Sequence, residues 1–246
     1  MKIWIKRVII GLLALVILAV TGLWIWSATG TYPAGELAER ALQNSSDVNV
    51  SRGEWIVLEP DQAEDIGLVF YPGGLVALSA YAPVLRNLAE AGYLVVIIPM
   101  PLDLAIFDTD AAQAVLEAYP QIQNWVLAGH SLGGAAASIH AENAAGDFAG
   151  LALWDSYPAS YADLSDNAIE VISIFGTLNE VPNPDGFDDT RALLPPDTQF
   201  EGIEGANHAQ FGDYGPQSGD VAARISAAQQ HQLITDLMLE FLAGLH

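Results

Sequence analysis

The chain has 246 residues, enough for one domain with a full core, and 52% of them are apolar, which excludes a disordered chain. Thirty acidic residues against eight basic ones give a formal net charge of −22, so the surface repels nucleic acid and anionic lipid headgroups and favours neutral or cationic substrates. The absence of cysteine from the sequence excludes disulfides, a thiol nucleophile and a cysteine-ligated metal.

Residues 1–30 predict a basic start followed by a membrane segment. The uncharged run 8–26 would span about 28 Å as a helix, close to the hydrocarbon thickness of a bilayer. Lys2, Lys6 and Arg7 precede it, and this positive flank places the N-terminus in the cytoplasm and the rest of the chain outside. A cleaved signal peptide, and hence secretion, is the alternative. We expect an uncleaved single-pass anchor because the segment after Trp26 offers a poor cleavage site.

Residues 31–48 predict a linker with a short amphipathic helix, and residues 49–246 predict the folded domain. Strands and helices alternate through the domain, and the strands are continuously apolar. That pattern is typical of an α/β fold with a doubly wound, mostly parallel sheet flanked by helices. The expected strands are 54–58, 66–71, 93–98, 125–128, 150–154, 169–175 and 198–203. The expected helices are 80–91, 110–119, 135–145, a short one near 190, and 225–242.

The stretch Gly129-His-Ser-Leu-Gly133 stands between an expected strand and an expected helix. A nucleophilic serine at the end of a strand must turn sharply into the next helix, and glycine two residues to either side removes side chains that would collide. A glycine-rich helix start gives the same short pattern, but the strand–turn–helix setting favours a nucleophile elbow with Ser131 at its tip. The backbone N–H of Leu132 is then a candidate oxyanion donor.

A serine nucleophile needs a base, and His208 is the best placed of the histidines because it follows the last expected strand. In an open α/β sheet the carboxyl ends of the strands form the active face, so Ser131 and His208 can meet there. A hydrogen-bonding role in its loop is the alternative for His208. The other histidines are expected to be structural or exposed: His130, which we expect to point away from Ser131, His140, His231 and His246.

The loop after the strand 66–71 predicts the second oxyanion donor. It contains Pro72-Gly-Gly-Leu75, where glycine lets the backbone approach a substrate carbonyl. The N–H of Gly74 is the first candidate and that of Leu75 the second, with an ordinary Pro-Gly turn as the alternative. The aromatic and polar tract 210–220, directly after His208, is expected to wall the substrate site or to be a structural loop.

Taken in order, these motifs resemble the α/β-hydrolase superfamily. The motifs are Phe70-Tyr-Pro-Gly-Gly74, Gly129-His-Ser-Leu-Gly-Gly134, Ile174-Phe-Gly-Thr177 and Gly205-Ala-Asn-His208. Three longer stretches, at 81–93, 98–102 and 207–217, resemble in particular the bacterial α/β-hydrolase-family proteins with an N-terminal membrane anchor. The resemblance covers residues 50–244 and implies a Ser–acid–His hydrolase that uses no metal and no organic cofactor.

The sequence departs from this family at the acid. The family pattern has an aspartate three residues after Gly176, where this chain has Asn179. A neutral amide can orient the imidazole but supplies no charge to stabilise the imidazolium. Three hypotheses follow: Asp155, at the end of the preceding strand, takes the role as in some lipases of the superfamily; Glu180 reaches round with its longer side chain; or Asn179 remains and activity is weak or lost.

The sequence therefore predicts a hydrolase of carboxylic esters, with Ser131 as nucleophile and His208 as base. The connection between 155 and 169 is too short for a sizeable lid, which favours small or medium acyl substrates. Lactone or dienelactone opening would use the same groups. A hypothesis from another class is a membrane-anchored, non-catalytic binding protein with a degenerate triad, motivated by Asn179.

Overall fold

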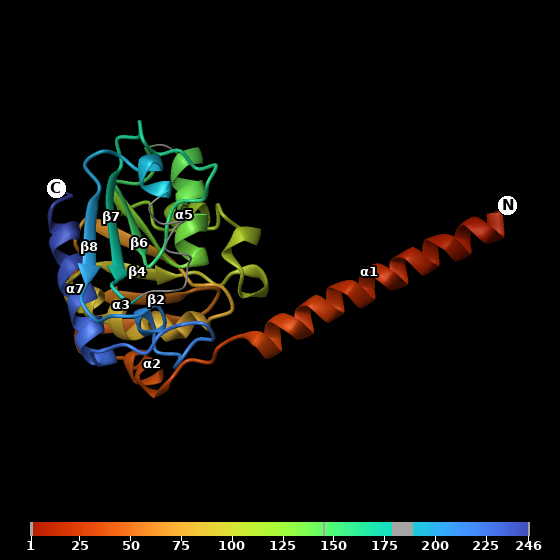
Figure 1. The fold of residues 1–246 in the computed structure, drawn as a ribbon, viewed down its shortest axis with the longest axis horizontal. Helices are drawn as coiled ribbons and strands as arrows, with labels where there is room; N and C mark the ends of the chain where they lie inside the picture. The colour runs from red at the N-terminus through yellow and green to blue at the C-terminus, as the bar shows by residue number, and fades with distance from the viewer. Residues whose placement is uncertain (1, 145, 179–188, 246) are drawn as a thin grey trace.

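The computed structural model describes residues 2–144, 146–178 and 189–245. The first helix, α1 (Lys2–Gly30), projects from the domain as a single rod (Figure 1). Large apolar side chains are exposed along it, from Trp4 to Trp26. This helix is long and apolar enough to cross a membrane, and a signal sequence at the same position would share these properties.

One sheet runs through the domain. Its strands within the described residues are β1 (Val48–Arg52), β2 (Ile56–Pro60), β3 (Ile66–Tyr71), β4 (Leu94–Ile97), β5 (Asn124–His130), β6 (Gly150–Trp154), β7 (Glu170–Gly176) and β8 (Gln199–Ile203). Their order is β1-β2-β4-β3-β5-β6-β7-β8. β2 pairs antiparallel with β1 and β4, and every pair from β4 to β8 is parallel. The predicted doubly wound, mostly parallel sheet is confirmed.

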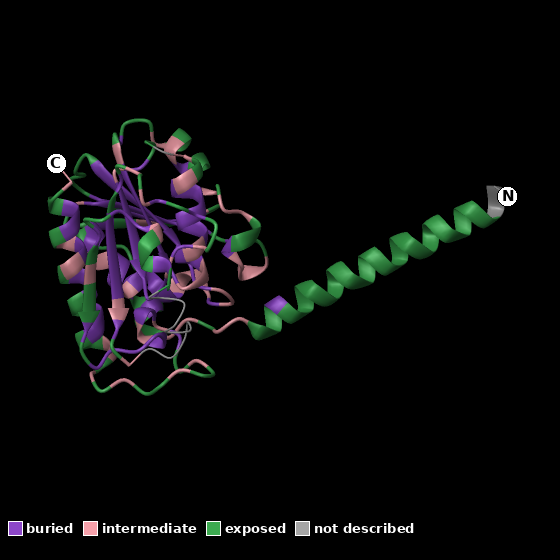
Figure 2. Ribbon diagram, turned by 45° about the horizontal axis from the view of Figure 1, so that its top comes forward, coloured by how far each residue is buried: buried purple, intermediate pink, exposed green. Residues whose placement is uncertain are grey.

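Helices cover both faces of the sheet. The longer ones in the domain are α3 (Ala82–Glu90), α4 (Ala112–Ala118), α5 (Leu132–Asn143) and α7 (Ala227–Ala243), and a short α2 (Glu36–Ala41) precedes the sheet. The 3-10 helices are η1 (Leu78–Tyr81), η2 (Pro101–Asp103), η3 (Ala105–Phe107), η4 (Arg191–Leu193) and η5 (Ala209–Phe211). Alternate strand residues feed two buried clusters, with Val126 on the side of α3 and α7 and Leu127 on the side of α4 and α5. Buried residues therefore fill the inner strands β3 to β7, whereas the edge strands β1 and β8 are mostly exposed or half-buried (Figure 2).

The segment 31–48, which we expected to be a linker, packs onto the domain. α2 buries Ala38 and Ala41. The carboxylate of Asp213 accepts the backbone N–H of Ala38 at 2.9 Å, and its backbone carbonyl accepts that of Gly35 at 2.6 Å. The segment 48–52, for which we predicted no strand, is β1 at the edge of the sheet. The end of α1 is thus fixed closely to the folded domain.

The strand register brings several chain segments to one edge of the sheet. Tyr71 of β3 pairs with Gly129 of β5, and His130 of β5 pairs with Trp154 of β6. Ser131 and Asp155 therefore each follow the end of a strand, on neighbouring parallel strands. The loop after β8 brings His208 to the same edge, as the position of these residues in the sequence predicted.

Candidate active site

The turn from β5 to α5 has the geometry of a nucleophile elbow. Ser131 has φ 53° and ψ −122°, a strained conformation that side-chain-bearing residues rarely adopt. A Cβ on Gly133 would collide with the carbonyl oxygen of Tyr71, and one on Gly129 would lie 2.5 Å from the backbone of Gly133. Glycine at both positions therefore lets the chain turn this tightly and leaves Ser131 half-buried at the start of α5.

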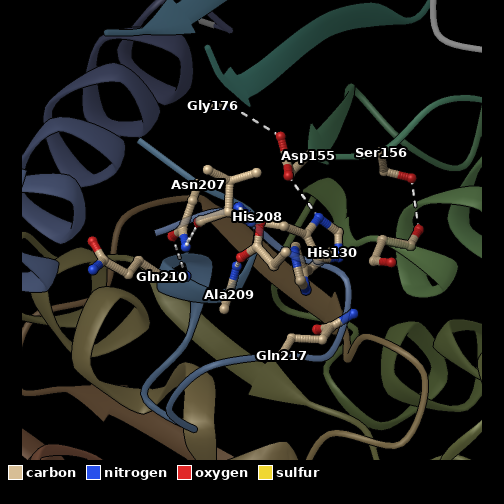
Figure 3. Close-up of polar contacts among 12 residues, drawn as sticks. His130, Asp155, Ser156, Gly176, Asn207, His208, Ala209, Gln210 and Gln217 are labelled. Carbon is tan, nitrogen blue, oxygen red and sulfur yellow. Dashed lines mark hydrogen bonds and ion pairs between the residues drawn. The ribbon is translucent and has the colours of Figure 1, made fainter. Parts of the chain in front are cut away.

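His208 and Asp155 form a buried pair. Nδ1 of His208 lies 2.6 Å from a carboxylate oxygen of Asp155, and both side chains are fully buried. The other oxygen of Asp155 accepts the backbone N–H of Gly176 at 2.9 Å, and Figure 3 shows both contacts. Desolvation raises the pKa of Asp155, while the hydrogen bond from His208 acts to lower it. With its Nδ1 proton held by Asp155, His208 keeps a lone pair on Nε2.

The structure brings Asp155, and not another described carboxylate, into hydrogen-bonding contact with His208 Nδ1. Of the three hypotheses for the acid, this geometry favours the first. Asn179 and Glu180, on which the other two depend, lie outside the described residues. Asp155 has φ 44°, so the turn that aims its side chain at the histidine is itself strained.

Nε2 of His208 is buried and has no hydrogen-bond partner among the described residues. The hydroxyl of Ser131 therefore does not reach it in this structure. Hydrogen bonds between a nucleophile and its base are often long in ligand-free enzymes and tighten when substrate binds. The two residues are still close neighbours, because the ring of His130, next to Ser131 in the chain, lies 4.4 Å from the ring of His208.

Two backbone N–H groups at this edge are free to bind an oxyanion. Those of Leu132 and Gly74 have no acceptor within the described part of the chain. The N–H of Leu75, our second candidate, donates to the carbonyl of Asp103 at 2.8 Å and is not available. A Cβ on Gly74 would lie 3.1 Å from the side chain of Leu132, so the two free donors come from loops that touch.

Tyr81 joins the two loops that carry these donors, a contact that our reading of the sequence missed. Its hydroxyl accepts the N–H of Gly73 at 2.9 Å and lies 2.9 Å from Nδ1 of His130. Burial raises the pKa of Tyr81, so the phenol keeps its proton and can donate it to His130. Tyr81 thereby links the loop of Gly74 to the residue before Ser131.

His130 was expected to be structural or exposed and to point away from Ser131. The structure buries it, as for a structural residue, and places its ring against that of His208. Desolvation and the neighbouring His208 hold the pKa of His130 well below its usual value, which keeps its ring neutral. Phe211 stacks on His130, with ring centroids 5.6 Å apart and planes at 12°. An uncharged ring next to His208 adds no repulsion when His208 itself takes up a proton.

The loop of His208 is held in place by two polar side chains, the buried Gln230 and the half-buried Asp220. The side chain of Gln230 accepts the N–H of Asn207 at 3.2 Å and donates to its carbonyl at 2.8 Å. Asp220 accepts the N–H groups of His208, at 3.4 Å, and of Ala209, at 2.8 Å. Residues of the tract 210–220, such as Phe211 and Asp220, thus support the histidine, which corresponds to the structural alternative that we gave for this tract.

A pocket of about 200 Å³ opens beside the serine. Its lining residues are Ser131, Leu132, Ala135, Ser156 and Tyr157. The hydroxyl of Ser156 donates to the carbonyl of Ser131 at 2.6 Å, which fixes the part of the pocket wall formed by Ser156 and Tyr157 to the nucleophile elbow. Drug-sized ligands occupy sites of about 300–1,000 Å³, so this pocket fits a smaller group.

Three side chains at this site could also offer ligands to a metal ion. They are His130, Asp155 and His208, with one ligand atom of each within 4.8 Å of the others. The hydrogen bonds of Asp155 to His208 and of Tyr81 to His130 already engage three of these side-chain atoms. Nε2 of His130 and of His208 has no hydrogen-bond partner among the described residues.

Comparison with known proteins shows the family and the fold of the chain. A family model described as the alpha/beta hydrolase family matches residues 67–232. No curated protein matches the chain. Among solved structures, the alpha/beta hydrolase enzyme MGS-MChE2, from the metagenome of sediments of the lagoon of Mar Chica, Morocco, is 19% identical with a TM-score of 0.58, over 78% of this chain and 98% of its own. A protein from Thermoplasma acidophilum described as a predicted CIB-like hydrolase is 10% identical with a TM-score of 0.60, over 78% of this chain and 99% of its own. At these identities the two structures show a shared fold.

Proposed function

The chain belongs to the alpha/beta hydrolase family, and from this premise we propose that it hydrolyses carboxylic esters with Ser131, His208 and Asp155 as its catalytic residues. The observation that carries the proposal is the buried 2.6 Å hydrogen bond between His208 Nδ1 and Asp155. It sets the tautomer in which Nε2 can accept a proton from a serine hydroxyl.

In the proposed reaction, Ser131 Oγ attacks the ester carbonyl carbon while His208 Nε2 takes up the hydroxyl proton. The N–H groups of Leu132 and Gly74 stabilise the oxyanion that forms. The carbon–oxygen bond of the ester then breaks, and the leaving alcohol receives the proton from His208. A water molecule then attacks the acyl carbonyl carbon while His208 Nε2 takes one of its protons. The bond from the acyl carbon to Ser131 Oγ breaks, His208 returns the proton to Oγ, and the carboxylic acid leaves.

We assign the acid role to Asp155 rather than to Glu180 or Asn179. Its carboxylate is buried with His208, so the interaction between the carboxylate and the imidazolium is little screened by water. The lowered pKa of His130 supports the same assignment, because its ring stays neutral during the reaction. When His208 takes up the serine proton, Asp155 then faces one positive charge, that of His208.

The pocket size supports a small or medium acyl group on the substrate. The acidic surface, with five arginines and no lysine after residue 31, disfavours anionic esters. Lactones present the same carbonyl chemistry, and a panel of linear esters and lactones with matched carbon number would separate the two activities.

We also propose that residues 1–30 anchor the protein in a membrane, with the N-terminus in the cytoplasm. Residues 31–48 then join the anchor to a hydrolase domain, 49–246, on the opposite side. Recovery of residues 1–26 in membrane-extracted mature protein would support this arrangement. A mature N-terminus near Thr29 would refute it in favour of secretion.

Labelling of the full chain with a fluorophosphonate tests the proposed chemistry directly. We expect a single adduct on Ser131 that disappears in S131A and persists in S165A, which removes an exposed hydroxyl elsewhere. Absence of any adduct on the unmodified chain would refute the hydrolase and leave a non-catalytic binding protein with the same fold.

A further inference from the structure

The short segment Pro101–Phe107 lies against the end of α1. The hydroxyl of Ser27, in the last turns of that helix, donates to the carbonyl of Leu102 at 2.7 Å. Just past the helix, the hydroxyl of Thr31 donates to the carboxylate of Asp103 at 2.6 Å. Two side-chain hydrogen bonds therefore fix this segment to the point where α1 leaves the domain.

The same segment borders the candidate oxyanion loop. The carbonyl of Asp103 accepts the N–H of Leu75, directly after Gly74. The side chain of Leu104 comes within 3.5 Å of where a Cβ on Gly74 would lie. Leu102 and Asp103 both have positive φ, at 57° and 55°, so the segment holds a strained shape between the helix and the site.

Ile106 and Phe107 carry apolar side chains on the outside of this segment. They are 40% and 57% exposed, and they are the only two exposed large apolar residues adjacent in sequence in the described part of the chain beyond α1. Two such side chains in one short 3-10 helix are better explained by a surface that covers them than by scattered exposure.

The length of α1 indicates what that surface is. If the uncharged run 8–26 crosses the hydrocarbon, Trp24 and Trp26 lie at the membrane–water boundary, where exposed tryptophan is favoured. Ser27 directly follows Trp26, so its hydrogen bond to Leu102 holds the segment Pro101–Phe107 at the depth of the membrane–water boundary. Figure 1 shows that α1 leaves the domain on the side away from α7, which places α7 far from the bilayer.

We propose that Pro101–Phe107 rests on the bilayer beside the anchor and that the site takes its substrate from this surface. The substrate class is an amphiphilic ester whose apolar tail stays in the bilayer and whose short acyl group enters the pocket beside Ser131. Its polar part is uncharged or zwitterionic, because the acidic domain and the nearby Asp103 and Asp108 repel anions. This inference rests on the proposed ester hydrolysis and on the proposed anchor.

The position of the segment can be measured without activity because the chain has no cysteine. A single cysteine at F107C, labelled with an environment-sensitive fluorophore, is compared with one at L233C, an exposed apolar residue on α7. In the full chain reconstituted into phosphatidylcholine vesicles, we expect blue-shifted emission and quenching by lipid-attached quenchers at 107 only. Water-like emission at both positions would overturn the proposal.

The substrate class is tested with two butyrate esters, one water-soluble and one of a long-chain alcohol held in the same vesicles. For the double variant I106S/F107S we expect the ratio of bilayer-ester to soluble-ester turnover to fall about tenfold, because two apolar side chains no longer insert. L233S is the matched control and keeps the ratio of the unmodified chain. An unchanged ratio in I106S/F107S would overturn delivery from the bilayer.

The two proposals fail in different ways. If the unmodified chain hydrolyses neither ester and takes no fluorophosphonate label, the proposed function fails, and the emission at 107 still decides whether the segment contacts the bilayer. If it hydrolyses the soluble ester but not the bilayer ester, the proposed function stands and the substrate class inferred here is wrong.

Discussion

Replacing Asp155 by asparagine tests the electrostatic part of the site with little change of shape. The amide oxygen of D155N can still accept the N–H of Gly176, which now donates to the carboxylate at 2.9 Å. Its amide nitrogen, however, would donate to His208 Nδ1, which moves the imidazole proton to Nε2. His208 can then no longer accept the proton of Ser131, and the imidazolium loses its buried counter-charge.

The expected magnitude follows from the burial of the pair. Asp155 and His208 are both excluded from water and 2.6 Å apart, so nothing else screens the lost charge. An equivalent substitution in a serine protease triad lowers kcat by about 10⁴, which corresponds to about 5.4 kcal/mol of transition-state stabilisation. The folded state should not suffer, because D155N also removes a carboxylate whose pKa is raised by desolvation.

The assay compares kcat and Tm of D155N with those of D166N, which removes the same charge from an exposed position. We expect D155N to lose about 10⁴ in kcat at an unchanged or higher Tm, and D166N to match the unmodified chain. A D155N enzyme within threefold of the unmodified rate would refute the reasoning. Loss of activity in E180Q would then move the acid to Glu180, whereas full activity in both variants would leave Asn179 in that position.

Two further predictions concern the buried groups around the histidine. Y81F leaves the N–H of Gly73 without its acceptor. We therefore expect the free energy of unfolding, measured by urea denaturation, to fall by about 1–3 kcal/mol, and kcat to fall at unchanged KM. An unchanged free energy of unfolding together with an unchanged kcat would show that Tyr81 does not position the oxyanion loop. The second prediction is that Tm falls as the pH drops from about 6.5 to 5. Burial lowers the pKa of three histidines below their usual 6.5, so the unfolded chain binds more protons in this range and folding weakens as the pH falls. The three are His130, His140 and His231. The raised pKa of Asp155 acts in the opposite direction but is one group against three; a Tm that stays level or rises toward pH 5 in calorimetry would contradict this sign.

The sequence was sufficient to predict the elements that depend on local patterns. The strands 66–71 and 150–154 have the same bounds in the structure as in the prediction, because continuous apolar runs between turn residues set them. The elbow was predictable for a similar reason, since Gly129 and Gly133 bracket Ser131 within five residues.

Contacts between distant segments were not predictable from the sequence. Tyr81 and His130 are 49 residues apart, and no local pattern signals that their side chains meet. The packing of residues 31–48 depends in the same way on Asp213, which is 175 residues away from Ala38. For Asp155 the strand-end position made it one of three candidates, and only the packing of β6 beside the loop of His208 distinguishes it from the others.

The most direct test of the account is a crystal structure of the full chain with a phosphonate bound covalently to Ser131. We expect the phosphonyl oxygen about 2.7–3.1 Å from the N–H groups of Leu132 and Gly74, with His208 Nε2 in hydrogen-bonding contact with the adduct and Nδ1 still on Asp155. An adduct in which His208 faces away from Ser131, or in which a carboxylate other than Asp155 holds Nδ1, would contradict it.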